Sequence, residues 1–449
     1  MERWKEILEI AWPLIIANSF WNIQLTIDRL FVGNYSTEAL AAATAVMGVF
    51  WTPMALLQQT AAYLMTFVAQ YYGARRLQMI GPAVWQSIYV SIIGGILILL
   101  LIPVAKEIFL AINHSPSIQN LETDYFIAIC FSALPTALVA SASGFFTGLG
   151  NTRIVMWINC SGMVANFIFD YLLIFGKLGF PAMGIKGAGY ATAIANCVAT
   201  GLGFYLILNK SNESEYKILS GWKWDSELMK RFIKYGIPSG LQWALEGLAF
   251  TVFLIIIGRM NNGSAALASS GIVVTIMLLS VLPAMGVAQS VSVLVGQHLG
   301  ENKPKQAEYA TWSGLQIAIM YIFTMGITFI LFPNFYLNWF HNPEDPKIWM
   351  QVSIIVPYLL MYVALFTSFD CMNMIFSFAL KGAGDTRFVT IVAMLVPWPL
   401  MVIPTYFFKD REGAVYWAWG AASIFIITQA FIFLQRFLGG KWKNMRVIN

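Results

Sequence analysis

Residues 84–110 read VWQSIYVSIIGGILILLLIPVAKEIFL, an apolar run whose charged residues are Lys106 and Glu107, both near its end. An apolar helix of about 20 residues crosses the hydrocarbon core of a bilayer, so this stretch is long enough to span a membrane. Of the 449 residues in the chain, 58% are hydrophobic and 11% are charged. Soluble domains carry about 25% charged residues. The sequence therefore predicts an integral membrane protein.

Comparable apolar segments recur on both sides of this run, and we predict twelve membrane-spanning helices in all. The predicted spans are residues 8–32, 40–71, 84–110, 123–148, 154–176, 187–208, 236–257, 266–297, 309–333, 349–380, 388–408 and 414–437. The first segment lacks an obvious small-residue cleavage site and continues to about Val32, so we interpret it as a membrane helix and not as a removable signal peptide.

The basic residues are divided unequally between the two sides of this arrangement. Of the 27 Lys and Arg residues, 19 fall on the side of the N-terminus and 8 on the opposite side. Loops rich in Lys and Arg remain in the cytoplasm. We therefore expect a multi-pass protein of the plasma (inner) membrane with both termini in the cytoplasm.

The two halves of the chain repeat each other. TGLGNTR (147–153) matches KGAGDTR (381–387) at a distance of 234 residues, and VAQYYG (68–73) matches VGQHLG (295–300) at 227 residues. Two further pairs keep the same order at nearly the same distance. Each half holds an even number of spans, so both halves enter the membrane from the same side. This predicts a parallel repeat about a pseudo-twofold axis along the membrane normal, as in duplicated transporters.

The predicted fold is therefore an all-α membrane protein with twelve helices in two pseudo-symmetric six-helix bundles. The longest polar stretch, Asn209–Lys230, separates six spans from six. We expect residues 1–208 to form an N-terminal lobe, residues 209–230 a cytoplasmic linker, and residues 231–449 a C-terminal lobe.

Four acidic residues lie inside predicted spans: Asp28, Asp170, Glu246 and Asp370. Each costs roughly 2.5–3.5 kcal/mol at a helix centre, or about 10 kcal/mol together. No Lys or Arg is expected deep in a span to neutralise them. Carboxyl groups at that depth should hold a proton or be neutralised by a bound cation, and both outcomes are typical of ion coupling.

Polar side chains accompany these acids along single helix faces, at spacings of three or four residues. The stripes are Asn159, Gly162, Asn166 and Asp170; Ser239, Gln242 and Glu246; Asp370, Asn373 and Ser377; and Gln24 with Asp28. Such stripes must face protein or water. The alternative to a functional site is that they form hydrogen bonds that hold the bundle together. That alternative explains the amides as well as a site does, but it does not require carboxylates.

Aromatic and methionine side chains are candidates for a substrate cavity, because flat lipophilic cations bind by stacking and cation–π contact. The candidates are Trp21, Trp51, Met54 and Phe67, with Gln24, Gln242 and Asn373 as polar members. Most aromatic residues of a membrane protein instead face lipid or fill its core. The sequence has no Walker A motif, catalytic nucleophile motif or basic stripe for nucleic acid. We therefore expect neither an ATPase nor an enzyme, and no cofactor beyond a coupling ion.

Motifs spread over nearly the whole chain resemble those of the multidrug and toxic compound extrusion (MATE) family. They are TIDRLFVG from Thr26, VAQYYGARR from Val68, TGLGNTR from Thr147, NFIFDYLLIFG from Asn166, GAGYAT from Gly187, GIPSG from Gly236, VGQHLGENKPKQA from Val295 and LKGAGDTR from Leu380. The resemblance implies two six-helix lobes around a V-shaped cleft. It also implies an antiporter that exports organic cations and drugs in exchange for Na⁺ or H⁺, and so confers drug resistance. We expect a monomer.

The resemblance also implies site residues. Asp28, Asn166, Asp170 and Thr192 match the family's N-lobe site for a cation or proton. Glu246 and Asp370 match acidic positions in the C-lobe of the NorM-like branch, a pair that the DinF-like branch commonly lacks. Because this chain has both sets, the resemblance leaves open which lobe couples.

The coupling ion is open as well. The neutral oxygens of Asn166 and Thr192 favour Na⁺ over H⁺, whereas Asp170 stands where some Na⁺-driven NorM-like members have Asn. Two other functions are alternatives. A lipid-linked oligosaccharide flippase of the same superfamily would need basic residues in its cavity, and a non-transporting sensor or membrane enzyme would need a further domain or a nucleophile cluster.

Overall fold

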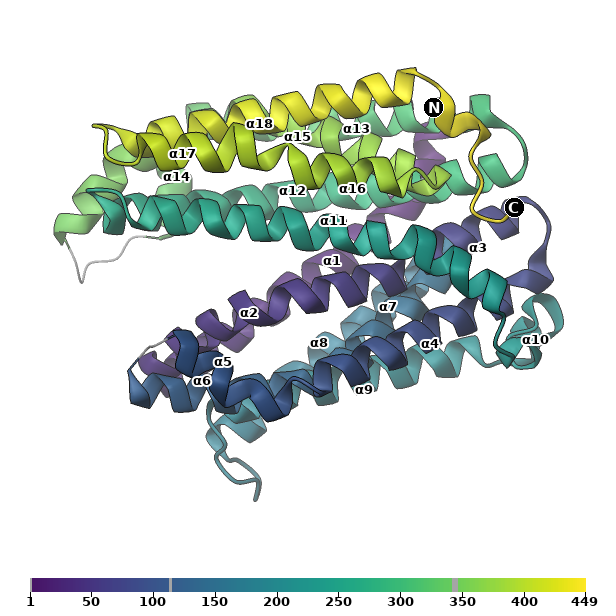
Figure 1. The fold of residues 1–449 in the computed structure, drawn as a ribbon, viewed down its shortest axis with the longest axis horizontal. Coiled ribbons are helices and arrows are strands. Elements are labelled where there is room, and N and C mark those ends of the chain that lie inside the picture. Colours follow the sequence, from purple (N-terminus) through teal and green to yellow (C-terminus); the bar gives the residue numbers. More distant parts are fainter. Residues whose placement is uncertain (1, 113–114, 341–345) are drawn as a thin grey trace. The chain divides into compact units, whose positions relative to one another are not determined.

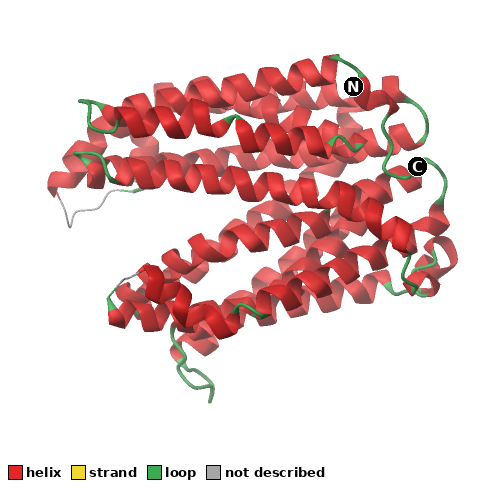
Figure 2. Ribbon diagram, viewed as in Figure 1, coloured by secondary structure: helices red, strands yellow, loops and turns green. Residues whose placement is uncertain are grey.

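The computed structural model describes residues 2–112, 115–340 and 346–449, and these residues form helices and loops without a strand (Figure 2). The α-helices (Figure 1) are α1 (Glu2–Tyr35), α2 (Thr37–Ala62), α3 (Leu64–Gly73), α4 (Ile80–Leu99), α5 (Ala105–Ile112), α6 (Pro116–Cys130), α7 (Ala133–Gly148), α8 (Thr152–Phe175), α9 (Ile185–Ile207), α10 (Lys210–Tyr216), α11 (Ser226–Gly258), α12 (Gly263–Gly300), α13 (Pro304–Leu331), α14 (Pro333–Asn338), α15 (Pro346–Ala383), α16 (Thr386–Leu395), α17 (Ile403–Phe408) and α18 (Ala414–Leu438). The short turns are η1 (Leu77–Met79), η2 (Ile102–Val104), η3 (Ser220–Trp222), the π-helical η4 (Trp398–Val402) and η5 (Lys441–Asn444).

The predicted spans correspond to these helices. Among the described residues, ten helical segments are long and apolar enough to cross a membrane, and α6 with α7 forms an eleventh that bends by 40°. The twelfth is α1, which has 34 residues. This helix is less apolar than the other spans because it carries Asn18, Asn22, Gln24 and Asp28. Pro397 and Pro399 lie at the π-helical turn between α16 and α17, where the missing proline N–H groups break the regular hydrogen bonding.

The helix pair α8–α9 is held at close range by small residues. Gly176 ends α8 in the left-handed region at φ +66°, which glycine adopts without strain. In α9, a Cβ atom at Gly187 would lie 2.6 Å from the carbonyl oxygen of Leu173. The backbones of the two helices therefore touch, and this contact fixes the register between the polar face of α8 and the start of α9.

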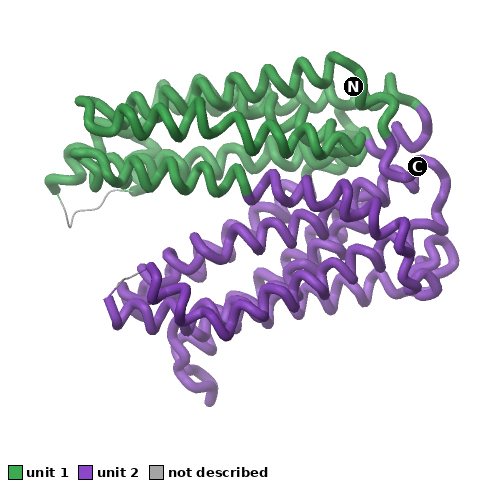
Figure 3. The backbone as a smooth tube through the Cα atoms, in the orientation of Figure 1, with its two compact units in different colours: residues 1–12, 245–295, 303–445 green, residues 13–244, 296–302, 446–449 purple. Residues whose placement is uncertain are grey.

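The described chain divides into two compact units (Figure 3). Unit 1 comprises residues 1–12, 245–295 and 303–445, and unit 2 comprises residues 13–244, 296–302 and 446–449. Each unit has a core of its own, around Phe253, Phe366 and Trp419 in unit 1 and around Phe50, Phe109 and Phe126 in unit 2. The lobe boundaries expected from the sequence remain a prediction.

The polar stretch Asn209–Lys230 packs against α4 within unit 2. The indole Nε1 of Trp85 donates a hydrogen bond to the Ile218 carbonyl oxygen at 2.6 Å, and the Tyr89 hydroxyl donates to the Trp222 carbonyl. Hydrogen bonds from Ser220 and Leu219 hold the pKa of Glu213 below its ordinary value. The stretch is thus a folded element tied to the helix beside it, with helical turns at α10 and η3.

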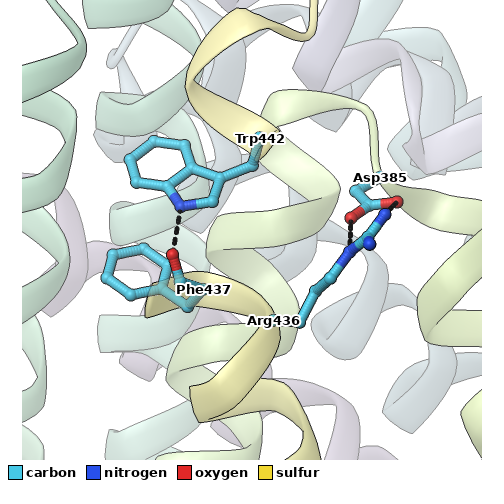
Figure 4. Close-up of polar contacts among 4 residues, drawn as sticks. All are labelled: Asp385, Arg436, Phe437 and Trp442. Carbon is cyan, nitrogen blue, oxygen red and sulfur yellow. Dashed lines mark hydrogen bonds and ion pairs between the residues drawn. The ribbon is translucent and has the colours of Figure 1, made fainter. Parts of the chain in front are cut away.

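In unit 1, a buried ion pair joins the start of α16 to the end of α18 (Figure 4). Arg436 donates from Nε to Asp385 Oδ2 at 2.7 Å and from Nη2 to Asp385 Oδ1 at 3.2 Å. Asp385 is 6% exposed. Nearby, Trp442 Nε1 donates to the Phe437 carbonyl at 2.8 Å. Asp385 belongs to the KGAGDTR repeat, and its equivalent in TGLGNTR is Asn151. The two copies of the motif have therefore diverged. In the second copy, the bidentate Asp385–Arg436 ion pair connects α16 to α18.

The other repeated motif brings α3 and the end of α12 together within unit 2. A Cβ atom at Gly73 would lie 2.0 Å from the carbonyl oxygen of Gln297, and one at Gly300 would lie 2.3 Å from the carbonyl oxygen of Gln70. Gly73 and Gly300 occupy the same position of the motif, as do Gln70 and Gln297. The contact is therefore reciprocal: the glycine of each motif copy packs against the glutamine backbone of the other copy.

Candidate functional site

The polar residues predicted on α1, α8 and α9 form one cluster in unit 2. Asp28 comes from α1, Asn166 and Asp170 from α8, and Thr192 from α9. Asn166 and Asp170 are one turn apart on the same face of α8, and both are 0% exposed. Asp28 is partly buried. The structure thus brings together four side chains that lie up to 164 residues apart in the chain.

Asn166 is the centre of the hydrogen bonds in this cluster. With its amide nitrogen facing the carboxyl groups, it donates to Asp28 Oδ1 at 2.9 Å and to Asp170 Oδ2 at 3.0 Å. The opposite orientation would direct the amide oxygen at two carboxyl oxygens. Asp28 also forms side-chain hydrogen bonds with Asp170 and Thr192. The second oxygen of Asp170, Oδ1, is buried and has no hydrogen-bond partner among the described residues.

These contacts limit the charge that the cluster can hold. Two carboxyl groups can form a hydrogen bond with each other only if one of them carries a proton. A buried carboxylate oxygen without a donor is also costly unless a proton or a cation compensates it. Arg29 acts on Asp28 electrostatically, but its own side chain is exposed. The geometry therefore suits binding of one monovalent cation, either H⁺ or Na⁺.

The predicted aromatic candidates do not share one environment. Trp21 and Trp51 are neighbours with ring centroids 5.7 Å apart, and Trp21 is 42% exposed. Phe67 is 0% exposed and packs on Phe232 at 5.3 Å between centroids. Met54 is 4% exposed and belongs to the core of unit 2. In this structure, an accessible aromatic surface is thus present at Trp21 and Trp51, whereas Phe67 and Met54 lie within the packed interior.

Gln24 and Gln242 accompany the acids on their helices. Gln24 is partly buried one turn before Asp28 on α1, and Gln242 is 5% exposed on α11, one turn before Glu246. Both therefore keep the helical register that the sequence predicts.

A second polar cluster lies in unit 1, on α11, α15 and α18. Gln429 Nε2 donates to Glu246 Oε1 at 3.1 Å, and Asn373 Nδ2 donates to Gln429 Oε1 at 3.4 Å. Asn373 also forms a hydrogen bond with Asp370. The predicted residues Glu246 and Asp370 are thus linked through two amides, of which Gln429 is 0% exposed.

No Lys or Arg was expected deep in a span, and Lys381 lies in the last turn of α15, yet its side chain is buried. Lys381 is 5% exposed on α15, and Glu246 acts on it electrostatically. The sequence placed Lys381 one residue beyond the predicted span 349–380, where a lysine normally reaches the membrane surface. In the structure, α15 continues to Ala383 and packing against neighbouring helices covers this side chain.

Other residues of these clusters were not singled out from the sequence. Gln429 is one of two glutamines in an otherwise apolar helix. Tyr125 (6% exposed) acts electrostatically with Asp28 and Asp170, and Glu122 is 0% exposed immediately before the predicted span 123–148. Lys381 did carry a signal: it lies eleven residues after Asp370 and continues the stripe through Asn373 and Ser377 on α15.

Comparison with known proteins identifies the family. The MatE family model matches residues 13–172 and again residues 238–407. The two matches begin 225 residues apart, which confirms the internal repeat. The chain is 26% identical over 452 residues to a probable multidrug resistance protein NorM of Thermotoga maritima, covering 99% of this chain and 94% of that protein. It is also 26% identical to one of Listeria monocytogenes, covering 96% and 93%.

Solved structures share the fold. One is a MATE protein in complex with MaL6, with a TM-score of 0.89, 20% identity, and coverage of 99% of this chain and 98% of that one. Another is described as the outward-facing conformation of a multidrug resistance MATE family transporter of the MOP superfamily, with a TM-score of 0.88, 20% identity and coverage of 99% and 97%.

These comparisons confirm the twelve-helix, multi-pass membrane fold. The family model covers well over half of the chain, in two copies that lie on either side of residues 209–230. MATE proteins are transporters and not enzymes. The chain therefore belongs to the MATE family of membrane transporters.

Proposed function

We propose that this protein is a secondary antiporter that exports organic cations in exchange for H⁺ or Na⁺, with the coupling ion bound at Asp28, Asn166, Asp170 and Thr192. The observation that carries this proposal is the buried contact among the two carboxyl groups and the Asn166 amide. Such a site must gain or lose a cation whenever its access to water changes. It therefore provides an obligatory step that needs no ATP and no covalent chemistry.

The Asn166 amide supports competition between the two ions. When one carboxyl group is protonated, the amide nitrogen can face both acids and donate to them over 2.9 and 3.0 Å. Rotation of the amide by about half a turn would instead present its oxygen, which together with carboxylate and hydroxyl oxygens is the ligand type that a hard cation prefers. We infer that H⁺ and Na⁺ use the same site in two amide orientations.

The charge of the intramembrane residues supports a cationic cargo. Acids at Asp28, Asp170 and Asp370 attract cations, and Trp21 beside Trp51 offers an indole surface for a flat lipophilic cation. The relatives named as multidrug resistance proteins agree with such a cargo. A cationic substrate can neutralise the acidic site in place of the coupling ion. Substrate and coupling ion therefore compete for the site, and the protein exchanges one for the other.

The proposal is tested in proteoliposomes under separately imposed Na⁺ and pH gradients, with ethidium as the cationic dye and no ATP. We expect dye movement opposite to at least one gradient, and collapse of that movement by the matching ionophore. The matched control is Asp124→Asn, because Asp124 pairs with Lys186 at 3.0 Å on the protein surface and should not affect coupling. Transport that proceeds equally without either gradient, or that requires ATP, would contradict the proposal.

We also propose that both termini and the Asn209–Lys230 stretch face the cytoplasm. The reason is that 19 basic residues fall on that side of the membrane and 8 on the opposite side, and basic loops remain in the cytoplasm. In a background with Cys160 and Cys197 replaced by alanine, a cysteine at Ser220 should not react with an impermeant maleimide added to intact cells. A cysteine at Ser115 should react, because this exposed residue lies in a predicted outer loop. Labelling at Ser220 from outside would reverse the assignment.

A further inference from the structure

A groove of about 330 Å³ lies on unit 2 between α4 and α9, and α7, which packs against both helices, contributes Leu138 to it. We call it the α4–α9 groove. Its lining residues are all apolar or aromatic, and they include Ile88 and Ile92 of α4 with Ile218 and Leu219 of the stretch that follows α9. Ile88 and Ile218 are 8% and 1% exposed, whereas Ile92 and Leu219 are 37% and 52% exposed. The groove therefore has a packed floor and an open rim.

The α4–α9 groove lies at the depth of one membrane leaflet. Its lining residues on α4 run from Val84 to Ile92, which is about 12 Å along the helix axis. Half of a hydrocarbon core of about 30 Å is about 15 Å. The helices α4 and α9 belong to segments that are long and apolar enough to cross a membrane. The acyl chain of a lipid is therefore the molecule available to fill an apolar groove at this position.

Aromatic side chains mark the membrane surface beside the groove. The ring centroid of Tyr89, on α4, lies 5.8 Å from that of Trp85 and 5.4 Å from that of Trp224. The Tyr89 hydroxyl donates to the Trp222 carbonyl. Trp222 and Trp224 are 57% and 53% exposed. Exposed Trp and Tyr side chains are enriched at the level of the lipid headgroups, so residues 217–224 are expected at that level.

The segment 217–224, KILSGWKW, carries positive charge only. Lys217 and Lys223 are exposed, and the segment has no acidic residue. Ile218, which directly follows Lys217, lines the groove. The nearest acids, Glu213 and Asp225, each accept hydrogen bonds from two backbone N–H groups. A negatively charged headgroup beside the groove is therefore attracted by two lysines whose neighbouring acids already have partners.

We propose that the α4–α9 groove, together with Lys217 and Lys223, is a binding site for an anionic phospholipid. An acyl chain occupies the groove, and the phosphate lies at the two lysines. The chain accounts for the apolar lining, and the headgroup accounts for the basic residues at the membrane surface. A zwitterionic lipid fills the groove equally well but has no net charge for the lysines, so the site discriminates between headgroups. The assignment depends on neither the exported substrate nor the coupling ion.

The first test concerns the headgroup. Purified, delipidated full-length protein is titrated with dioleoylphosphatidylglycerol or with dioleoylphosphatidylcholine, and native mass spectrometry gives the Kd of the first bound lipid. We expect the Kd of the anionic lipid to be at least about tenfold lower, because each lysine contributes about fivefold. Lys217→Gln combined with Lys223→Gln should abolish this preference. The matched control is Lys303→Gln with Lys305→Gln, which removes two exposed charges at the start of α13 and should preserve it.

The second test concerns the acyl chain. Ile92→Trp places a larger side chain at the rim of the groove and leaves both lysines in place. We expect the Kd of both lipids to rise at least about tenfold, because displacing two methylene groups from the groove suffices for this factor. Leu219→Trp is a second variant at the rim. The matched control is Ile96→Trp, one turn further along α4, because Ile96 is 49% exposed and does not line the groove.

Each result decides the proposal. Preference for phosphatidylglycerol that is lost in the double lysine variant, with weaker binding of both lipids in the tryptophan variants, supports it. Equal Kd values for the two lipids in the wild type, or a preference that survives without Lys217 and Lys223, overturn the headgroup site. Unchanged binding in both Ile92→Trp and Leu219→Trp overturns the groove as the place of the acyl chain. These measurements involve no transport, so failure of gradient-driven dye export would contradict the proposed function alone.

Discussion

The Asp28→Asn protein is expected to fold, reach the membrane and lose gradient-driven export, with the initial rate falling at least about tenfold. Asparagine keeps the shape of the side chain and can still meet Asp170 and Asn166 by hydrogen bonds. It cannot release a proton, and it offers no charge to Na⁺. The variant therefore resembles the site with its ion permanently bound, so the exchange step cannot be completed.

The measurement is ethidium transport in proteoliposomes under the gradient that drives the wild type, with the amount of protein per vesicle determined in parallel. Asp170→Asn should reproduce the loss, because Asp170 is the second carboxyl group of the same buried pair. Asp124→Asn serves again as the surface control. If Asp28→Asn exports dye at the wild-type rate, Asp28 has a structural role, and coupling must be sought at Glu246 and Asp370.

The Gly73→Ala protein is expected to be strongly destabilised, with an unfolding temperature several °C below that of the wild type. The added Cβ would lie 2.0 Å from the Gln297 carbonyl oxygen and 2.8 Å from its carbon. Both are backbone atoms, so a rotamer change cannot relieve the clash and α12 must move. Overpacking costs about 1–3 kcal/mol where side chains can adjust, and a backbone clash should reach or exceed the upper end of that range.

Thermal unfolding in detergent provides the measurement, with Gly300→Ala as the reciprocal variant, since its Cβ would lie 2.3 Å from the Gln70 carbonyl oxygen. The matched control is Gly48→Ala within α2, where nothing lies within 4 Å of the new atom. That control should be neutral or stabilising by about 0.5–1 kcal/mol, because alanine restricts the unfolded chain and favours the helix. Equal unfolding temperatures for Gly73→Ala and Gly48→Ala would show that the repeat contact does not hold α3 against the end of α12.

The sequence by itself determined the membrane class, the spans and the internal repeat. Each of these depends on local composition: an apolar window of about 20 residues identifies a span whatever it packs against. Repeated motifs such as 68–73 and 295–300 identify the duplication without any knowledge of the fold. The acids Asp28, Asp170, Glu246 and Asp370 were also evident, because a carboxyl group in an apolar segment is rare and costly.

The tertiary structure decided which of these acids meet and what compensates them. Helical spacing places Asn166 and Asp170 on one face of α8, but only the packing of α1 against that face brings Asp28 to them. Lys381 is a second case in which the sequence pattern did not predict the environment of a side chain. Beside the end of a span it is expected to extend to water, yet α15 continues past it and its side chain is buried. The burial of a side chain depends on helices that are distant in sequence, and no local pattern of residues contains that information.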